Sequence, residues 1–272
     1  MGILDAVSTS VTGISAQAYA LQNISGNVAN SSTVGFKAVN TDFTDMLNNT
    51  LNSGQLSGSV SATSTLTNTL AGSTTSTGVN TNMALSGNGF FVVAQNNGSS
   101  DTPAFSSQSL YTRRGDFTED ADGYLVNGAG YYLCGSSSGA GGTSPIKLPT
   151  TNSAATGQQV PSSVSIGSDG TITGSYADGS TAALGKVAVA QINGTDFMQS
   201  ENGGAYSATT ASGAASLGMN SSTINAGYVE ASNTDISDQF SKMIMTQQAY
   251  SSNTKVLSSA NEMLEDAINM MK

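Results

Sequence analysis

The sequence predicts an α+β protein in which two heptad helices, one near each end of the chain, pair as a coiled-coil stalk, with a mostly antiparallel β-domain between them. The helices are indicated by apolar residues that return every seven positions in the first and last parts of the sequence. The β-domain is indicated by short aromatic and β-branched runs that Asp-Gly and Asn-Gly turns divide, in a chain with 31 Gly and only 4 Pro.

The first heptad segment runs from residue 4 to residue 28. Two unbroken rows of residues, each with a spacing of seven, lie beside one another there: Val7, Ile14, Leu21 and Val28 in one, and Leu4, Val11 and Ala18 in the other. Such rows form a narrow seam along one side of a helix, and the seam needs a packing partner. Gly13 and Gly26 are the weak points, since Gly costs a helix about 1 kcal/mol relative to Ala.

The last forty residues carry the longer heptad segment. Its main row is Ile236, Met243, Tyr250, Leu257, Leu264 and Met271, and its companion row is Phe240, Gln247, Thr254, Asn261 and Ile268. The helix would be about 54 Å long at 1.5 Å per residue, which is too long for the inside of a compact small domain. We therefore expect it to pack with other helices, in its own chain or in other copies; an ordinary core helix is the alternative.

These patterns divide the chain into three parts. Residues 1–43 with 233–272 are expected to form a terminal helical domain, 44–82 a linker rich in Ser, Thr and Asn, and 83–232 a β-rich outer domain. The uncharged stretch within the linker is either ordered between subunits or disordered. In the outer domain, Asp169-Gly170 and Asp178-Gly179 predict hairpin turns.

Charge and composition exclude several functions. The net charge of −10 disfavours nucleic acid and anionic membranes as partners, because both require clustered Lys and Arg. With no His and a single Cys134, the chain cannot build a Ser-His-Asp triad or a usual zinc site. We expect no catalytic residue, cofactor, metal or small-molecule substrate. Arg113-Arg114, the only basic pair, is interpreted as a solvated strand end or as a partner for a carboxylate of another subunit.

A specific resemblance begins where the first helix ends, in LQNISGNVANSSTVGFKAVNTDF. This segment resembles the N-terminal signature of bacterial flagellar rod and hook axial proteins. The later segments GNGFF, YTRRGDF, DGYLVN, LGKVAVAQI and GYVEASNTDIS resemble the same family in the same order, although Thr234 stands where the family usually has Val. The residues carried over from its motifs are Asn27, Asn30, Gly35, Phe36, Lys37, Glu230 and Asn233.

The resemblance implies a structural subunit without catalytic function. It implies a helical homopolymer in which the terminal helices form an inner tube and the β-domain an outer layer, located in the flagellar hook or basal body outside the cytoplasmic membrane. The implied partners are adjoining rod, hook-cap and hook-filament junction proteins and the flagellar type III export apparatus. The lack of a basic, apolar leader in the first residues agrees with such export.

Two positions in the axis and one other class of protein remain open. The LGKVAVAQI and GYVEASNTDIS segments favour a hook protein, the torque-transmitting universal joint and export conduit, whereas the length of 272 residues favours a rod protein, the drive shaft of the basal body. A secreted adhesin-like binding module with a coiled-coil stalk is the alternative from a different class. For the polymer, we expect inter-subunit helix packing by Leu4, Val7, Val11, Ile14, Leu21, Val28, Ile236, Phe240, Met243, Gln247, Tyr250, Leu257, Leu264 and Ile268.

Overall fold

The computed structural model describes residues 3–48, 56–98, 104–106, 108–136, 143–150, 159–219 and 222–270. The chain divides into two compact units. We call residues 1–31, 38–67 and 234–272 the helical unit, and residues 32–37 and 68–233 the β unit.

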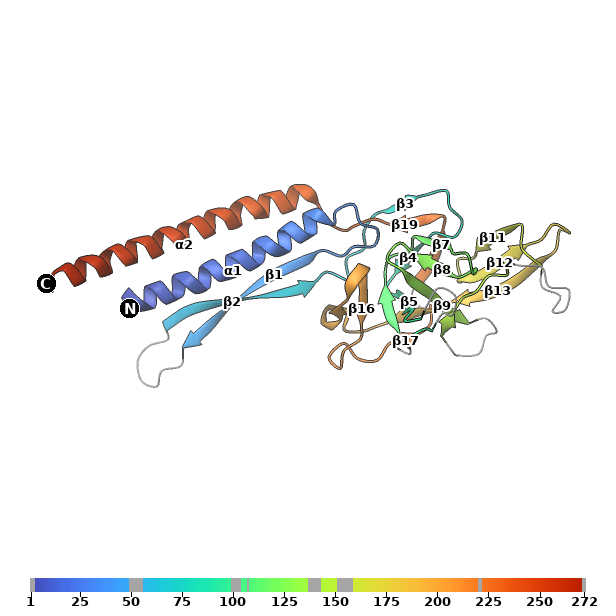
Figure 1. Cartoon of the computed structure of the whole chain (residues 1–272), viewed down its shortest axis with the longest axis horizontal. Helices are drawn as coiled ribbons and strands as arrows, with labels where there is room; N and C mark the ends of the chain where they lie inside the picture. The colour runs from blue at the N-terminus through green and yellow to red at the C-terminus, as the bar shows by residue number, and fades with distance from the viewer. Residues whose placement is uncertain are drawn as a thin grey trace. The chain divides into compact units, whose positions relative to one another are not determined.

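The helical unit contains the first and last helices of the chain and a β-hairpin. Helix α1 spans Ile3–Ala29 and helix α2 spans Ile236–Met270, and the two run side by side (Figure 1). At its start, α2 is capped by Asp235, whose Oδ1 accepts the backbone N–H of Ser237 at 2.8 Å. The expected α+β class with a helix at each end is thereby confirmed, while true coiled-coil supercoiling stays a prediction.

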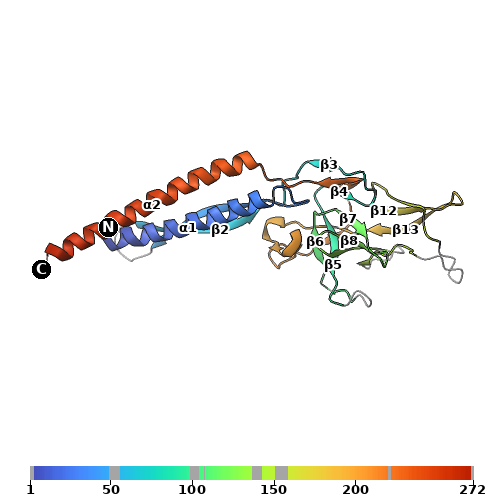
Figure 2. The same ribbon diagram turned by 45° about the horizontal axis from the view of Figure 1, so that its top comes forward.

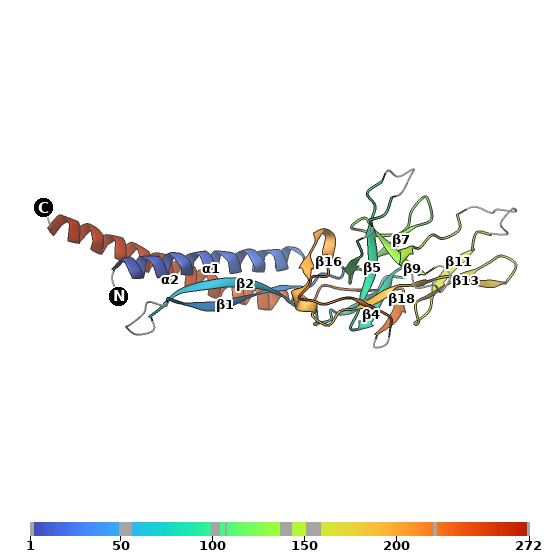
Figure 3. The same cartoon turned by 90° about the horizontal axis from the view of Figure 1, so that it is seen from below.

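A hairpin of strands β1 (Val39–Asn48) and β2 (Leu56–Leu66) lies along α1 (Figure 3). Polar side chains join it to the helix. Asn23 Nδ2 donates to Thr41 Oγ1 at 2.8 Å and to Ser64 Oγ at 3.0 Å, and the hydroxyls of Tyr19 and Ser64 are 2.6 Å apart. Strands β1 and β2 thus belong to the helical unit, although most of the hairpin falls in the 44–82 segment expected as a linker.

The buried face of α1 differs from the seam that the heptad rows indicate. Its buried residues are Ser10, Gly13, Ala16, Ala20, Ile24 and Asn27. The rows 13-20-27 and 10-17-24 lie one residue away from the expected rows, which rotates the covered face by about 100°. Small residues are used where α2 comes close: a Cβ on Gly13 would lie 2.8 Å from Asn253 Nδ2.

In α2 the covered face combines one expected row with an unexpected one. Gln239 and Ala260 are buried, and Thr246, Asn253 and Ala267, which share their seven-residue spacing, are half-buried. Met243, Leu257 and Leu264 of the expected main row are also half-buried. Polar and small residues therefore supply much of the helix pairing within one chain, and the larger apolar residues are left partly free.

The β unit consists of short antiparallel strands (Figure 2). The strands that form the path of the main sheet, in spatial order, are β11 (Ser163–Ile166), β12 (Thr171–Ser175), β13 (Thr181–Val187), β9 (Tyr131–Ser136), β5 (Phe90–Gln95), β6 (Leu110–Thr112), β16 (Ala205–Ser207) and β15 (Gln199–Ser200). Joined to this path are β7 (Phe117–Glu119), β8 (Leu125–Asn127), β10 (Ser144–Pro145), β14 (Val189–Gln191) and β17 (Ser216–Leu217). Two separate pairs are β4 (Met83–Gly87) with β18 (Ser222–Ala226) and β3 (Thr74–Ser76) with β19 (Tyr228–Glu230), and short 3-10 turns occupy Thr195–Phe197 and Asn202–Gly204.

Two hairpin turns predicted from Asp-Gly pairs are confirmed. Strand β11 pairs with β12, and β12 pairs with β13, across turns in which Gly170 has φ +83° and Gly179 has φ +81°. Only Gly adopts such values at low cost, and each preceding Asp closes its turn by accepting hydrogen bonds from Thr171 and Ser180.

The core of the β unit is apolar and closely packed. Phe91 and Phe117 are fully buried and meet edge to face at 5.7 Å between ring centroids. The other large buried side chains around them are Met83, Leu85, Val93, Leu125, Leu133, Ile146, Leu148, Ile172 and Ile224. This core holds the strand ends that carry the site described next. Within the described part of the chain, no helix is sufficiently long and hydrophobic to span a bilayer.

Candidate functional site

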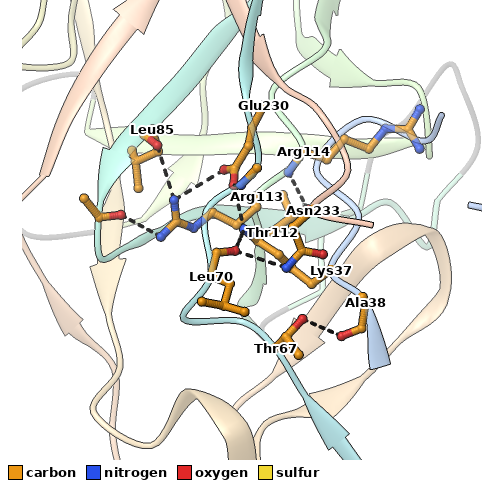
Figure 4. A network of polar contacts seen from close by, with 12 residues as sticks. Lys37, Ala38, Thr67, Leu70, Leu85, Thr112, Arg113, Arg114, Glu230 and Asn233 are labelled. Carbon is orange, nitrogen blue, oxygen red and sulfur yellow. Dashed lines mark hydrogen bonds and ion pairs between the residues drawn. The ribbon is translucent and has the colours of Figure 1, made fainter. Parts of the chain in front are cut away.

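Three charged residues far apart in sequence meet inside the β unit. Lys37 lies in the segment 32–37, Arg113 directly after β6, and Glu230 at the end of β19. Their side chains are between 1 % and 4 % exposed. We call Lys37, Arg113 and Glu230 the ion cluster (Figure 4).

The carboxylate of Glu230 is the centre of the ion cluster. Lys37 Nζ donates to Glu230 Oε1 at 2.6 Å, and the backbone N–H of Gly72 donates to the same oxygen at 2.8 Å. Arg113 Nη1 lies 3.4 Å from Glu230 Oε2. Charge-assisted bonds of this kind compensate for the removal of a carboxylate from water.

The two cations are also bonded to backbone carbonyls. Lys37 Nζ donates to the Leu70 carbonyl at 2.6 Å, while Arg113 Nη1 and Nη2 donate to the carbonyls of Leu85 at 3.3 Å and Gly87 at 2.6 Å. The guanidinium also stacks over the Phe90 ring, with Cζ 5.3 Å from its centroid. The ion cluster thus ties together the loop before β3, strand β4 and the chain after β6.

Backbone bonds hold the same segments together. The N–H of Gly35 donates to the Glu230 carbonyl at 2.7 Å, and the N–H of Asn233 donates to the Phe36 carbonyl at 3.3 Å. Gly35 has φ +66°, and a Cβ there would lie 2.6 Å from the backbone nitrogen of Arg114. The position therefore requires Gly both for its conformation and for space.

Burial dominates the electrostatics of the ion cluster. It lowers the pKa of Lys37, although the hydrogen bond that Lys37 donates to Glu230 opposes the shift, and it lowers the pKa of Arg113. Burial and the neighbouring Glu230 raise the pKa of Tyr206 to about 12. With two cations and one carboxylate, the ion cluster carries a net charge of +1.

The basic pair has a different role from either one expected. Arg113 is buried in the ion cluster, and Arg114 binds Asp116 through Nε at 2.7 Å and Nη2 at 2.8 Å. Both expectations for the pair, a solvated strand end and a carboxylate partner in another subunit, were wrong for Arg113, because Glu230 of the same chain supplies its carboxylate. The signal that could have shown this was the position of Arg113 inside the YTRRGDF motif.

Every residue of the expected family motif is placed by the structure, but in two groups. Gly35, Phe36, Lys37, Glu230 and Asn233 converge in the β unit. In the helical unit, Asn30 Nδ2 donates to the Gly26 carbonyl at 3.0 Å at the end of α1. Asn27 is buried there: its Nδ2 donates to the Val39 carbonyl at 2.9 Å and to Gln239 Oε1 at 3.1 Å, and its Oδ1 accepts the backbone N–H of Val39 at 2.9 Å.

The helical unit exposes many of its apolar side chains. Phe240 and Ile268, from the expected companion row, are 49 % and 60 % exposed. Others that remain exposed are Val11, Ile236, Ile244, Met245, Tyr250, Val256, Met263 and Met270, and Gln247 is exposed as well. Val7, Ile14, Leu21, Val28, Met243, Leu257 and Leu264 are half-buried, and the side chain of Leu4 lies outside the described residues. Large exposed apolar surface on a helix indicates a binding surface.

The features of the described residues that could suggest a catalytic or metal site have structural explanations. The acidic run before Gly123 is a hairpin turn, in which Asp120 Oδ1 accepts the N–H groups of Asp122 at 3.0 Å and Tyr124 at 2.8 Å. No group of three or more His, Cys, Asp or Glu side chains in the described ranges is arranged to hold a metal ion. Burial raises the pKa of the Cys134 thiol to about 12, which leaves it a poor nucleophile.

The chain matches known proteins in two comparisons, one with models of protein families and one with individual proteins. Residues 225–270 match the family model "Flagellar basal body rod FlgEFG protein C-terminal", and residues 84–174 match "Flagellar hook protein FlgE/F/G D1 domain". The flagellar basal-body rod protein FlgG of Bacillus subtilis (strain 168) is 30% identical over 274 residues, which cover 93% of this chain and 93% of the relative. The flagellar hook protein FlgE of Brucella abortus biovar 1 (strain 9-941) is 34% identical over 158 residues, which cover 56% of this chain and 37% of the relative.

Proposed function

Because the chain belongs to the family of flagellar rod and hook axial proteins, we propose that it is a structural subunit that polymerises with copies of itself through its terminal helices. Members of this family are parts of the flagellar basal body or hook. In the polymer, the helical units form the inner tube and the β units the outer layer. The chain has no catalytic task there, and its further partners are the adjoining axial proteins and the export apparatus.

The observation that carries this proposal is the exposed apolar surface of α2. Within one chain, α2 covers its small and polar residues, among them Gln239 and Ala260, and leaves Phe240, Ile244 and Met263 about half exposed. Full burial of such side chains contributes roughly 1.5 to 3 kcal/mol each, so covering the exposed half contributes roughly 1 kcal/mol each. Helices of neighbouring copies cover these side chains in the tube, and each such contact contributes this free energy to assembly. Within each copy, α1 and α2 form a supercoiled pair.

The position in the axis is proposed from the extent of the similarity. The match to rod protein FlgG runs over nearly the whole of both chains, whereas the match to hook protein FlgE covers 37% of that protein. This favours a rod subunit. A hook subunit is the second candidate, supported by the higher identity, 34% against 30%, over the segment that aligns with FlgE.

Immunogold labelling of isolated hook–basal bodies tests this proposal. An antibody against the β unit should label the rod region of structures from which the outer rings have been stripped, and should leave the hook unlabelled. Label on the hook alone would establish the second candidate. Absence of label from both would contradict an axial role altogether.

Substitution of the exposed helix surface tests the packing itself. Ile244→Gln should abolish polymers while the circular dichroism spectrum of the monomer stays unchanged, since Ile244 is 56 % exposed in the single chain. Ser258→Gln, which places the same amide at an exposed polar residue of the same helix, is the matched control and should leave both the monomer and its polymers intact. Normal polymers of the Ile244→Gln variant would show that this face is not an interface.

A further inference from the structure

The hairpin of the helical unit has an open edge on each side. Among the described residues, β1 and β2 form a two-stranded sheet, so each strand has a neighbouring strand on one side only. An open edge presents backbone N–H and C=O groups that can pair with a further strand. We call the side of β1 that points away from β2 the β1 edge, and the side of β2 that points away from β1 the β2 edge.

Asn27 shows which backbone groups of β1 point to the β1 edge. Its Nδ2 donates to the Val39 carbonyl and its Oδ1 accepts the Val39 N–H, at 2.9 Å each. Both groups of Val39 therefore point away from β2, and Asn27 bonds them as a neighbouring strand would. Because the direction alternates along an antiparallel strand, the same groups of Thr41, Phe43 and Asp45 also point to the β1 edge. No described residue bonds them there.

Space for a further strand lies beside the β1 edge. A cavity of about 370 Å³ is lined by residues 39–43 of β1, by Ala20 and Ile24 of α1, and by Lys242 of α2. Phe43 is 47 % exposed at this place. The β1 edge therefore faces an open, partly apolar space within the helical unit, where packed protein would otherwise satisfy its backbone groups.

The β2 edge carries the matching set of groups. Residues directly opposite one another in an antiparallel pair point either both inward or both outward. The partners of the three outward residues of β1 therefore also point outward, and no described residue bonds their backbone groups; these partners are Ser64, Ala62 and Val60. Over its 11 residues β2 has no Pro and no charged residue, so it lacks the features that commonly protect an open edge from pairing.

Charge favours pairing of the β1 edge with a β2 edge. Two β1 edges side by side would bring together Asp42 and Asp45 of both copies, and like charges on neighbouring strands destabilise a sheet. A β2 edge brings no charge. Because the two edges are different surfaces, each copy that binds through one edge still offers the other, and such a contact can repeat along an open-ended assembly.

We infer that the β1 edge pairs with the β2 edge of a neighbouring copy, so that the hairpins of successive copies form one continuous sheet. Copies that point the same way along the tube place β1 antiparallel to the neighbouring β2, as in the hairpin itself. The inference rests on the proposed self-assembly and names a pair of strands that make contact in it. This contact is separate from the apolar surface of α2.

Hydrogen exchange of backbone amides tests the pairing in the wild-type protein. Polymers and monomers are exchanged in D2O, dissolved in dimethyl sulfoxide and compared by NMR. The outward amides of Phe43 and Ala62 should exchange at least about tenfold more slowly in polymers, whereas the inward amide of Thr44 should be protected in both states.

Polymers in which the outward amides of either strand exchange as fast as in the monomer would overturn the inference and leave the proposed function standing. Absence of polymers, scored by electron microscopy, would overturn the proposed function and this contact with it.

A proline on the β2 edge tests the same contact by substitution. Ala62→Pro removes an outward N–H and places the ring on the β2 edge, while the N–H groups that bond β1 are kept. The concentration required for polymers should rise at least about tenfold, with an unchanged circular dichroism spectrum of the monomer. Ala62→Ser keeps the N–H and is the matched control, which should polymerise like the wild type. Normal polymers of Ala62→Pro would contradict the pairing, and if this variant fails to fold, the exchange measurement on the wild type decides.

Discussion

The Glu230→Gln substitution should strongly destabilise the β unit. It removes the only negative charge of the ion cluster and leaves Lys37 and Arg113 buried with a net charge of +2. The amide oxygen can still accept from Lys37 Nζ and the Gly72 N–H, so most of the hydrogen bonds survive and the loss is electrostatic. Breaking a buried ion pair by removing one partner costs about 3 to 5 kcal/mol.

Urea unfolding at pH 7, followed by tyrosine fluorescence, measures this loss. Of the nine tyrosines, all but Tyr19 and Tyr250 lie in the β unit, so the signal reports chiefly on that unit. Glu119→Gln makes the same chemical change at an exposed strand end and should alter stability by no more than about 0.5 kcal/mol. A Glu230→Gln variant as stable as this control would refute the reasoning.

A double-mutant cycle separates lost charge from lost packing. Adding Lys37→Met to Glu230→Gln returns the ion cluster to its original net charge of +1. The double variant should therefore be less destabilised than the sum of the single variants by about 0.5 to 3 kcal/mol. Strict additivity would mean that Lys37 and Glu230 do not interact across their 2.6 Å contact.

Three further predictions concern single positions. Gly72→Ala should lower the free energy of unfolding in urea by at least about 2 kcal/mol, because its Cβ would lie 2.0 Å from the Ala231 carbonyl oxygen. At Gly78 a Cβ has open space, so Gly78→Ala should lose only the about 1 to 2 kcal/mol that a left-handed backbone conformation costs Ala. Equal losses would contradict this contrast. The folded state keeps the Cys134 proton that the unfolded state releases above pH 9, so this thiol should lower stability by about 1.4 kcal/mol per pH unit between pH 9 and about 12. Above pH 10 the buried Tyr206 adds a slope of its own, so Cys134→Ala should remove the slope between pH 9 and 10 in alkaline unfolding curves and reduce it above pH 10; an unchanged slope would oppose this. Asn27→Ala should destabilise the helical unit by about 2 to 4 kcal/mol in thermal unfolding followed by circular dichroism at 222 nm, since it leaves three hydrogen bonds unmade; a shift no larger than that of the exposed Asn40→Ala would count against it.

The helices could be predicted from the sequence, but their facing sides could not. Heptad spacing of large apolar residues such as Ile14 and Leu21 correctly indicated helix, whereas the covered face uses Gly13 and Ala20, one position earlier. Small residues were favoured there because they allow a close approach between α1 and α2. Hydrophobic periodicity gives weight to large apolar side chains, so it does not indicate a helix contact made by small residues.

The hairpin and the ion cluster were missed for related reasons. Strand β2 consists largely of Ser, Thr and Ala, and its large apolar residues, Leu56, Val60 and Leu66, alternate with Ser and Thr only at wide spacing, which gives a weak strand signal. The strand is held by tertiary hydrogen bonds such as that between Asn23 and Ser64. The motif residues Lys37 and Glu230 were found by resemblance, but their contact is formed by residues 193 positions apart. Nothing in the local sequence indicates that these two side chains meet, and the YTRRGDF motif singles out Arg113 without showing its partner.

Electron microscopy of the purified, concentrated protein tests the central claim most directly. Wild-type protein should form open-ended helical tubes with a central channel, with the terminal helices at the inside and the β units outside. Discrete, closed oligomers of fixed size, as expected of an adhesin-like module, or particles that stay monomeric at every concentration, would contradict a self-assembling axial subunit.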